Sequence, residues 1–378
     1  MRSVYETCQL VFRPLIDFSF GRAFTYAGIR IVVASENPLV IEELCAYLPE
    51  LSEVGKGSPF EISFIINPEI EAEIRKYCSY GPEIQSKEDL FYSIRRAKEY
   101  ICYANTFGAD CDRHVLVKCG QRICIVSASD GEGAIRTPLR IFREVLLRQL
   151  ENSGGILVHA AAVKLKDSGG VLIVGDAKAG KTSSMCQLVL KAGADYISND
   201  RCILYKDGED IKCVGWPFAI RLGVGFLDDI GLLQLSDVEG LRRSQSPNLL
   251  MHENKKSGAF EWGSTEKIEL TPREFCEKFS CNYAEAVTLQ SVLFPQLTPD
   301  GARMVVSLAS EKTFETLDNN IYEPLDPDFL RGWLGIRSIS DEEILNNSML
   351  IVKELKKLKA LTITGDPRGD VFPAHVFE

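Results

Sequence analysis

The sequence lacks the closely spaced cysteines and histidines that metal–thiolate sites need. Its 12 cysteines are scattered singly, and no CxxC occurs. The closest pairs, Cys119/Cys124 and Cys276/Cys281, each have four residues between them, and the four histidines (114, 159, 252 and 375) do not complete a zinc-site pattern with them. Structural zinc sites use two short Cys or Cys/His clusters. We therefore expect no such site and interpret the cysteines as reduced thiols in the core.

The chain also lacks an excess of basic residues and any long apolar run. Lys plus Arg number 43 against 53 for Asp plus Glu, so the formal charge is -10 and the pI is near 5.2. Nucleic-acid binders need a basic face to displace counterions, so we exclude that class of partner. No stretch approaches the roughly 18 to 20 apolar residues that span a bilayer, and the first twenty residues carry Arg2, Glu6, Arg13 and Asp17. We expect a cytoplasmic protein without a membrane partner.

What is present is an ordinary globular composition on a long chain. The 378 residues are 45% hydrophobic and 25% charged, which is enough for a core without disulfides and fits one large domain or two smaller ones. Asn152-Ser-Gly-Gly155 is a candidate boundary. The sequence predicts an α+β N-terminal domain over residues 1–152, a candidate for substrate recognition, and a catalytic domain over residues 153–378.

Hydrophobic periodicity predicts the main elements of both halves. In the first half, strands are expected at 28–34, 60–66, 114–118 and 122–126, with helices at 38–48 and 137–150. In the second half, strands are expected at 156–163 and 171–174, with a helical tail at 341–358. The polar stretch from Arg242 to Gly258 predicts a loop that either orders over a ligand or is a disordered surface segment.

One motif carries specific chemistry. Gly175-Asp-Ala-Lys-Ala-Gly-Lys-Thr182 fits G-x-x-x-x-G-K-[ST], follows the predicted strand 171–174 and precedes a predicted helix at 183–191. Such a loop binds a phosphate chain through backbone N–H groups and the helix N-terminus, while the lysine contacts the β- and γ-phosphates and the hydroxyl ligates Mg²⁺. The predicted nucleotide-binding residues are Gly175, Asp176, Ala177, Lys178, Ala179, Gly180, Lys181, Thr182 and Ser183.

A second candidate group must act on the bound phosphate. Tyr196 begins a short predicted strand that leads into Asn199-Asp-Arg201, and a strand returning after the motif helix ends beside the phosphate loop. Asp200 is therefore a candidate general base or Mg²⁺ ligand, against the alternative of a turn-capping aspartate. His159, in the strand before, is by itself more typical of a core histidine.

Two other features compete with Asp200. Gly223-Val-Gly-Phe-Leu-Asp-Asp229 is interpreted as an apolar strand that ends in the paired carboxylates Asp228 and Asp229, as a Walker B site would, or as an ordinary strand-to-turn pair. Arg221, just before it, is a candidate phosphate clamp, against the alternative of a solvated side chain.

From Gly155 to about Gly225 the order of these pieces resembles the catalytic domain of HPr kinase/phosphorylase and its relatives. The resemblance lies in the following segments: Val158-His-Ala160, Val171 to Thr182, Ser198-Asn-Asp-Arg201, Ala219-Ile-Arg-Leu-Gly-Val-Gly225, and, beyond them, Glu269-Leu-Thr-Pro272 and Ser291-Val-Leu-Phe-Pro295. The strongest part covers about seventy residues.

This resemblance implies a phosphoenolpyruvate-carboxykinase-like P-loop fold and phosphoryl transfer from ATP to a serine-type hydroxyl. It implies that Asp200 is the general base with His159 beside it, that Lys181 is catalytic, and that Thr182 and Asp200 hold Mg²⁺. Hexamers occur in that family, which makes a homo-oligomer one expectation. The chain departs from the family at Asn199 and Ala219, where acidic residues are expected, and in its N-terminal half.

These departures favour a diverged kinase whose hydroxyl-bearing acceptor is a protein, a peptide, a free amino acid or a small metabolite. Two alternatives stay open. The same fold could remove phosphate from phosphoserine as a phosphorylase or phosphatase, or the domain could be a nucleotide-binding switch with little turnover. The sequence does not distinguish ATP, ADP and pyrophosphate as donor.

Overall fold

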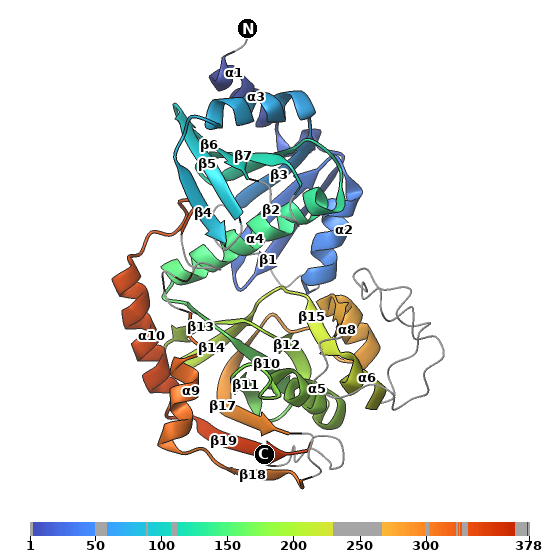
Figure 1. Ribbon diagram of the computed structural model, residues 1–378, viewed down its shortest axis with the longest axis vertical. Coiled ribbons are helices and arrows are strands. Elements are labelled where there is room, and N and C mark those ends of the chain that lie inside the picture. The colour runs from blue at the N-terminus through green and yellow to red at the C-terminus, as the bar shows by residue number, and fades with distance from the viewer. Residues whose placement is uncertain are drawn as a thin grey trace. The chain divides into compact units, whose positions relative to one another are not determined.

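The computed structural model of the protein describes residues 3–49, 59–87, 90–106, 112–229, 267–298, 302–322, 324, 326, 332–366 and 376. They form a mixed α/β structure with several sheets (Figure 1). The chain divides into two compact units: unit 1 comprises Met1–Cys45, Glu50–Asn152 and Glu323–Asp341, and unit 2 comprises Ala46–Pro49, Ser153–Tyr322 and Glu342–Glu378. Neither unit is one continuous segment of the chain.

Unit 1 contains an eight-stranded sheet with the order β1-β2-β3-β8-β7-β6-β5-β4. The β2–β3 and β3–β8 pairs are parallel and the others are antiparallel. Its strands are β1 (Phe20–Tyr26), β2 (Ile29–Ser35), β3 (Phe60–Ile66), β4 (Glu83–Lys87), β5 (Leu90–Ala97), β6 (Tyr100–Asn105), β7 (His114–Cys119) and β8 (Arg122–Ser127). The expected strands 60–66, 114–118 and 122–126 are confirmed. The strand expected from Gly28 begins one residue later, because Ala27 and Gly28 form the β1–β2 turn with positive φ values.

Helices cover both faces of this sheet (Figure 1). They are α1 (Val4–Val11), α2 (Pro38–Tyr47), α3 (Pro68–Cys78) and α4 (Glu132–Asn152), with a 3-10 turn at Leu15–Asp17. Helix α3 begins where the sequence supplies both start signals: the Asn67 side chain accepts from the Ile70 N–H, and Pro68 occupies the first turn. Its buried Ile74 and Cys78 pack on alternate side chains of the central strands, such as Val115 and Val117.

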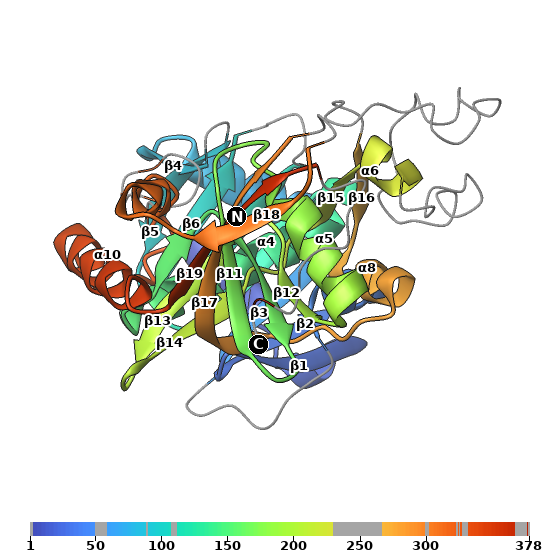
Figure 2. The same cartoon turned by 90° about the horizontal axis from the view of Figure 1, so that it is seen from below.

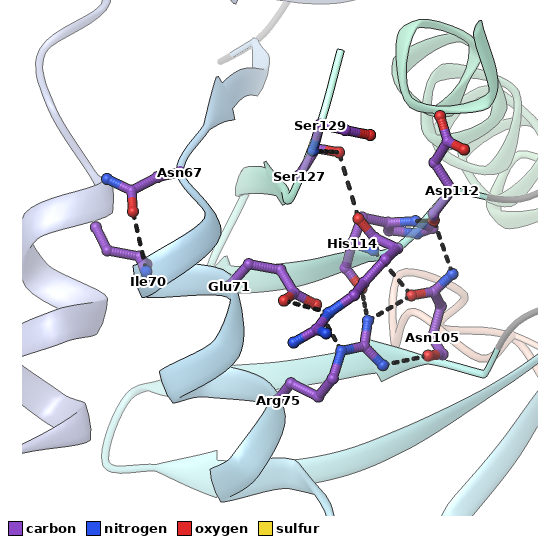
Figure 3. Close-up of polar contacts among 10 residues, drawn as sticks. Asn67, Ile70, Glu71, Arg75, Asn105, Asp112, His114, Ser127 and Ser129 are labelled. Atoms are coloured by element: carbon purple, nitrogen blue, oxygen red, sulfur yellow. Dashed lines mark hydrogen bonds and ion pairs between the residues drawn. The ribbon is translucent and has the colours of Figure 1, made fainter. Parts of the chain in front are cut away.

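A buried ion cluster joins α3 to the strands of unit 1 (Figure 3). The Glu71 carboxylate is fully buried and accepts hydrogen bonds from Arg75 Nε at 2.5 Å and Arg113 Nε at 2.6 Å. Arg75 also donates to the Asn105 side chain and to the backbone carbonyls of Asn105 and His114. Because each buried charge has a partner, the cluster avoids the several kcal/mol that an unpaired buried carboxylate costs.

Unit 2 contains a nine-stranded sheet whose strands follow the path β12-β10-β11-β17-β14-β13-β9, with β19 beside β17 and β18 beside β19. These strands are β9 (Ile156–Val158), β10 (Ala160–Leu165), β11 (Gly169–Val174), β12 (Asp195–Ser198), β13 (Cys202–Asp207), β14 (Asp210–Gly215), β17 (Ala286–Leu297), β18 (Val305–Leu308) and β19 (Lys359–Gly365). A two-stranded sheet pairs β15 (Ile220–Gly223) with β16 (Lys267–Leu270).

Successive side chains of strands β10 and β11 point alternately into two hydrophobic cores, one on each face of the sheet. Ala161, Val163 and Ile173 pack with α5 and α8, whereas Ala162 and Leu172 pack with α9 and α10. Figure 2 shows α5 and α8 on the side of the strands opposite to α10. The helices are α5 (Lys181–Ala192), α6 (Val224–Asp229), α8 (Pro272–Phe279), α9 (Glu315–Asp318) and α10 (Asp341–Leu355), with a 3-10 turn at Glu311–Phe314.

Two differences from the sequence-based expectation in unit 2 concern the candidate site, and the helical tail expected at 341–358 ends at Leu355. The strand expected at 156–163 is broken at His159 into β9 and β10. Residues 224–229 form the helix α6, so the prediction that an apolar strand runs on to Asp228 and Asp229 is wrong: the strand ends at Gly223. The buried apolar side chains of Val224, Phe226 and Leu227 are compatible with a short helix packed on the core as well as with a strand, because so short an apolar run does not fix the period.

Candidate active site

The break between β9 and β10 at His159 lies opposite a second break, between β12 and β13 at residues 199–201. Strand β10 pairs with β12 through Ala162 and Ser198, and β9 pairs with β13 through Val158 and Cys202, so the antiparallel register is the same on both sides. Between these pairs lie His159 on one segment and residues 199–201 on the other, outside the strands. Two stretches of chain without ladder pairing therefore face each other, and their side chains are available for a site.

His159 and Asp200 meet in this gap. His159 Nε2 lies 3.4 Å from Asp200 Oδ1, and the two side chains are 33% and 36% exposed. Asp200 Oδ2 lies 3.3 Å from Nη1 of Arg201. Both oxygens of the carboxylate are thus held, one by an imidazole and one by a guanidinium, while the group remains partly open to solvent.

The surroundings of Asp200 keep it ionised. Burial by itself raises the pKa of this carboxyl, but the hydrogen bond from His159 and the positive charges of Arg201 and Lys181 outweigh burial and lower the pKa below its ordinary value. A carboxylate that is charged at neutral pH and partly exposed can accept a proton or bind a cation.

Arg201 is itself held by aromatic neighbours. Its Nε donates to the hydroxyl of Tyr322 at 3.1 Å, and its guanidinium carbon lies 5.1 Å from the ring centre of Phe218 and 5.8 Å from that of Tyr322. The Ser198 hydroxyl stabilises the turn at residues 198–201: it donates to the backbone carbonyl of Arg201 and accepts from the backbone N–H of Trp216.

The motif loop lies between β11 and α5, with the strand and the helix that the sequence predicts on either side. Lys181 is the first residue of α5, and its Nζ donates to the carbonyls of Gly175 at 2.5 Å and Asp176 at 3.2 Å. Lys181 as a whole is 8% exposed. Of the other motif residues, Asp176, Ala177 and Lys178 are exposed, and Thr182 and Ser183 are half-buried in the first turn of α5.

Gly180 is required where this loop enters the helix. Its φ is +104°, and a Cβ there would lie 2.8 to 2.9 Å from atoms of the Leu297 side chain. Its carbonyl accepts from the Ser184 N–H at 2.8 Å, which closes the first turn of α5. Only glycine suits this combination of left-handed backbone and close packing.

The charges of Lys181 and Asp200 interact, and each changes the pKa of the other group. Burial lowers the pKa of Lys181, and the negative charges of Asp200 and Asp176 oppose part of that shift. In turn, the positive charge of Lys181 lowers the pKa of Asp200. This agrees with the topology: β11 and β12 run in the same direction on either side of β10, so both end at one edge of the sheet.

The remaining sequence candidates lie elsewhere. Arg221 is exposed in β15, and its Nε donates to Glu269 at 2.5 Å across the ladder to β16. A phosphate-clamp role for Arg221 stays a prediction. Asp228 is buried in α6, and the expected loop from Arg242 to Gly258 lies outside the described residues.

Sequence reasoning missed Arg201 and Tyr322 as members of the site. Arg201 directly follows Asp200 in the segment Ser198-Asn-Asp-Arg201, and this adjacency is the sequence signal that could have identified it. Nothing in the sequence around Tyr322 indicates a contact with Arg201, because it depends on how distant segments pair.

The oxygen donors available here suit Mg²⁺, which prefers one or two carboxylates together with hydroxyl, phosphate and water ligands. The predicted metal ligands are of these types: the Thr182 hydroxyl in the first turn of α5 and the Asp200 carboxylate. Beside Asp200, the amide oxygen Oδ1 of Asn199 is buried and has no hydrogen-bond partner among the described residues. Within the same residues no three His, Cys, Asp or Glu side chains gather as a ready-made metal cage.

Comparison with known proteins gives a weak likeness to solved structures. No family model matches the chain, and no curated protein matches it. Among solved structures it is similar to the HPr(Ser) kinase/phosphatase from Coxiella burnetii, with 11% identity, a TM-score of 0.21, and coverage of 53% of this chain and 97% of that one. A likeness this weak carries no functional conclusion by itself. Along the described residues, no helix has both the length and the apolar character needed to cross a membrane.

Proposed function

We propose that this protein is a kinase that transfers a phosphoryl group from ATP with Mg²⁺ to a hydroxyl of a protein, a peptide, a free amino acid or a small metabolite. The observation that supports it most is the His159–Asp200 pair at 3.4 Å, with Asp200 close enough to Lys181 of the motif loop for each charge to shift the other's pKa. A phosphate-binding loop beside an ionised carboxylate is the minimum that hydroxyl phosphorylation needs.

Each residue then has a defined task. Loop N–H groups from Gly175 to Ser183 and the Lys181 ammonium bind the phosphates, and Thr182 and Asp200 hold the metal, which when bound neutralises phosphate charge. Asp200 takes the proton of the acceptor hydroxyl as the new O–P bond forms. The bond from the γ-phosphorus to the bridging oxygen breaks, and ADP leaves. Positioning and charge stabilisation supply most of the acceleration.

His159 and the buried Asn199 have supporting tasks. The imidazole hydrogen bond to Oδ1 holds the carboxylate in one orientation and keeps it ionised. Asn199, where the resembling family has an aspartate, leaves the metal with one less negative charge than two carboxylates would supply.

The test is ³¹P NMR on the purified protein with Mg-ATP and a small-molecule and peptide extract of the cells that make it. The control variant is Asp200→Asn. A new phosphomonoester peak that is absent with Asp200→Asn supports the kinase and supplies the acceptor for isolation. Repeating the assay with pyrophosphate, and with phosphoserine in place of ATP, examines the other donors and the reverse reaction.

Two outcomes contradict the proposal. Unchanged ATP in the presence of measured ATP binding would favour a nucleotide-dependent switch. Release of phosphate from phosphoserine without any ATP-dependent product would favour the phosphatase.

A third outcome is compatible with the proposal. If ATP yields inorganic phosphate alone, and this activity is lost with Asp200→Asn, Asp200 is still the base and water is the acceptor in the absence of the right hydroxyl compound.

A further inference from the structure

Both partners of the Asp200 carboxylate are held by one short segment that is remote from them in sequence, residues 320–322. The His159 N–H donates to the Asn320 carbonyl at 2.7 Å, and the Tyr322 N–H donates to the Leu157 carbonyl at 3.1 Å. Ile321 forms an isolated antiparallel bridge with Val158. The segment therefore pairs with the chain at the point where β9 ends and His159 turns toward Asp200.

The same segment holds Arg201 through a side chain. Tyr322 accepts a hydrogen bond from Arg201 Nε at 3.1 Å, and Arg201 Nη1 lies 3.3 Å from Asp200 Oδ2. The Arg201 side chain is 14% exposed and lies close to the rings of Phe218 and Tyr322. Tyr322, Arg201 and Asp200 thus form a chain of polar contacts within unit 2.

This chain of contacts has a mechanical consequence. A guanidinium is planar and rigid, so a bond that fixes Nε also fixes the direction in which Nη1 points. With Nη1 fixed on Oδ2 and His159 on Oδ1, the carboxylate cannot rotate freely about its last bond. A general base that is held in one orientation avoids the loss in rate, about a hundredfold for a 1 Å error, that misplacement brings.

We propose that Arg201 and Tyr322 are positioning residues of the proposed phosphoryl transfer: Tyr322 orients Arg201, and Arg201 orients Asp200. This inference rests on the proposed function. Neither residue needs to contact the nucleotide or the acceptor, so their loss affects the chemical step and leaves nucleotide binding to the motif loop.

A double-mutant cycle tests the order of action. Tyr322→Phe removes only the hydroxyl and keeps the ring. The matched control is Tyr283→Phe, which removes another hydroxyl in unit 2 that donates to a backbone carbonyl, that of Tyr47, at 3.1 Å. The assay is phosphate release from Mg-ATP, or phosphomonoester formation once the acceptor is known. We expect Tyr322→Phe to lower kcat about fivefold and Arg201→Ala about a hundredfold, with the KM for Mg-ATP within about twofold of wild type and Tyr283→Phe unchanged.

The decisive comparison is Arg201→Ala with and without Tyr322→Phe. If Tyr322 acts through Arg201, the double variant has the kcat of Arg201→Ala alone, within about twofold. Effects that multiply would overturn the inference, since Tyr322 would then act independently. A kcat of wild-type size for Tyr322→Phe, or a loss that lies in KM for Mg-ATP, would overturn it as well.

A second readout does not depend on turnover. Proton exchange at Arg201 Nε–H, followed by NMR on arginine-labelled protein and assigned with Arg201→Lys, should be slow in wild type and in Tyr283→Phe and at least tenfold faster in Tyr322→Phe. Unchanged exchange in Tyr322→Phe contradicts the orientation of Arg201 by Tyr322.

Asp200→Asn distinguishes the two proposals: no turnover in wild type, or full turnover in Asp200→Asn, contradicts the proposed function itself. A loss with Asp200→Asn but not with Tyr322→Phe contradicts only the positioning inference.

Discussion

His159 Nε2 lies 3.4 Å from Asp200 Oδ1 because two neighbouring strand pairs lose their ladder bonding at the same level of the sheet. The hydrogen bond and the charge of Arg201 overcome the opposing effect of burial on the pKa of Asp200. The lowered pKa of the proposed base therefore depends in part on this contact, and removing the contact should raise that pKa.

The first prediction concerns His159→Asn, which removes the contact and leaves burial in place. Burial raises the pKa of Asp200, so the acid limb of the pH–rate profile should move to higher pH. Carboxylate-dependent turnover is present above that limb and lost below it. The measurement is kcat against pH for both proteins, and we expect a loss of about ten- to a hundredfold at pH 7. An acid limb at the wild-type position would contradict the role assigned to His159.

The second prediction contrasts two lysines of the motif loop. Lys181 is nearly buried and bonded to the loop carbonyls, whereas Lys178 is exposed. Lys181→Ala should lower turnover of Mg-ATP by about three orders of magnitude, because it removes the cation nearest the proposed phosphates. Lys178→Ala should change it by less than about threefold. Calorimetry with Mg-ADP, together with phosphate release, checks both; equal losses in the two variants would contradict the prediction.

The third prediction contrasts two left-handed glycines at the two ends of α5. Gly193 has a φ of +62° with nothing within 4 Å of an added Cβ, whereas at Gly180 the Cβ would meet Leu297 at 2.8 Å. Gly193→Ala should cost about 1 kcal/mol of stability, the backbone penalty alone. Gly180→Ala should cost about 3 kcal/mol and weaken Mg-ATP binding at least tenfold. Urea unfolding and nucleotide titration measure the two effects, and similar values for the two variants would show that Leu297 yields without cost.

The fourth prediction concerns pH and unit 1. Burial, assisted by the charge of Arg140, lowers the pKa of His114 to about 3. His114 Nδ1 lies 2.7 Å from the Asp112 carbonyl oxygen, a contact that opposes part of this shift, and Nε2 lies 2.9 Å from the Tyr92 hydroxyl. The unfolded chain binds this proton near the ordinary histidine pKa of about 6.5, so stability falls as pH drops below that value and stops falling near pH 3.

For this single group the loss between pH 7 and pH 5 is about 2 kcal/mol. Urea unfolding followed by tryptophan fluorescence can measure it, because Trp333 stacks on Tyr92 at 4.7 Å. His114→Gln should show a correspondingly smaller difference between the two pH values. An equal pH dependence in both proteins would mean that other groups account for it.

Several elements could be predicted from the sequence because their signals are local. The motif loop, with a strand before it and a helix after it, follows from a fixed pattern of glycines, lysine and threonine that only a few backbone conformations satisfy. The strand at 60–66 follows from alternating apolar residues, and the strand at 122–126 follows from a short apolar run after the turn at 119–121. Where the local signal was ambiguous, at 224–229, the prediction of a strand was wrong, since a short apolar run fits either structure.

The site depends on relations that no local pattern contains. His159 in a strand is by itself typical of a core residue; the interruption of two ladders in the same register exposes it and brings it to Asp200. Arg201 and Tyr322 meet because residues 320–322 pair with β9, a long-range contact with no sequence signature. The sequence by itself determined which groups can do chemistry, because chemistry belongs to residue types and their spacing. Only the tertiary structure decided which of these groups come together, because strand pairing between distant segments sets the distances on which proton transfer and charge stabilisation depend.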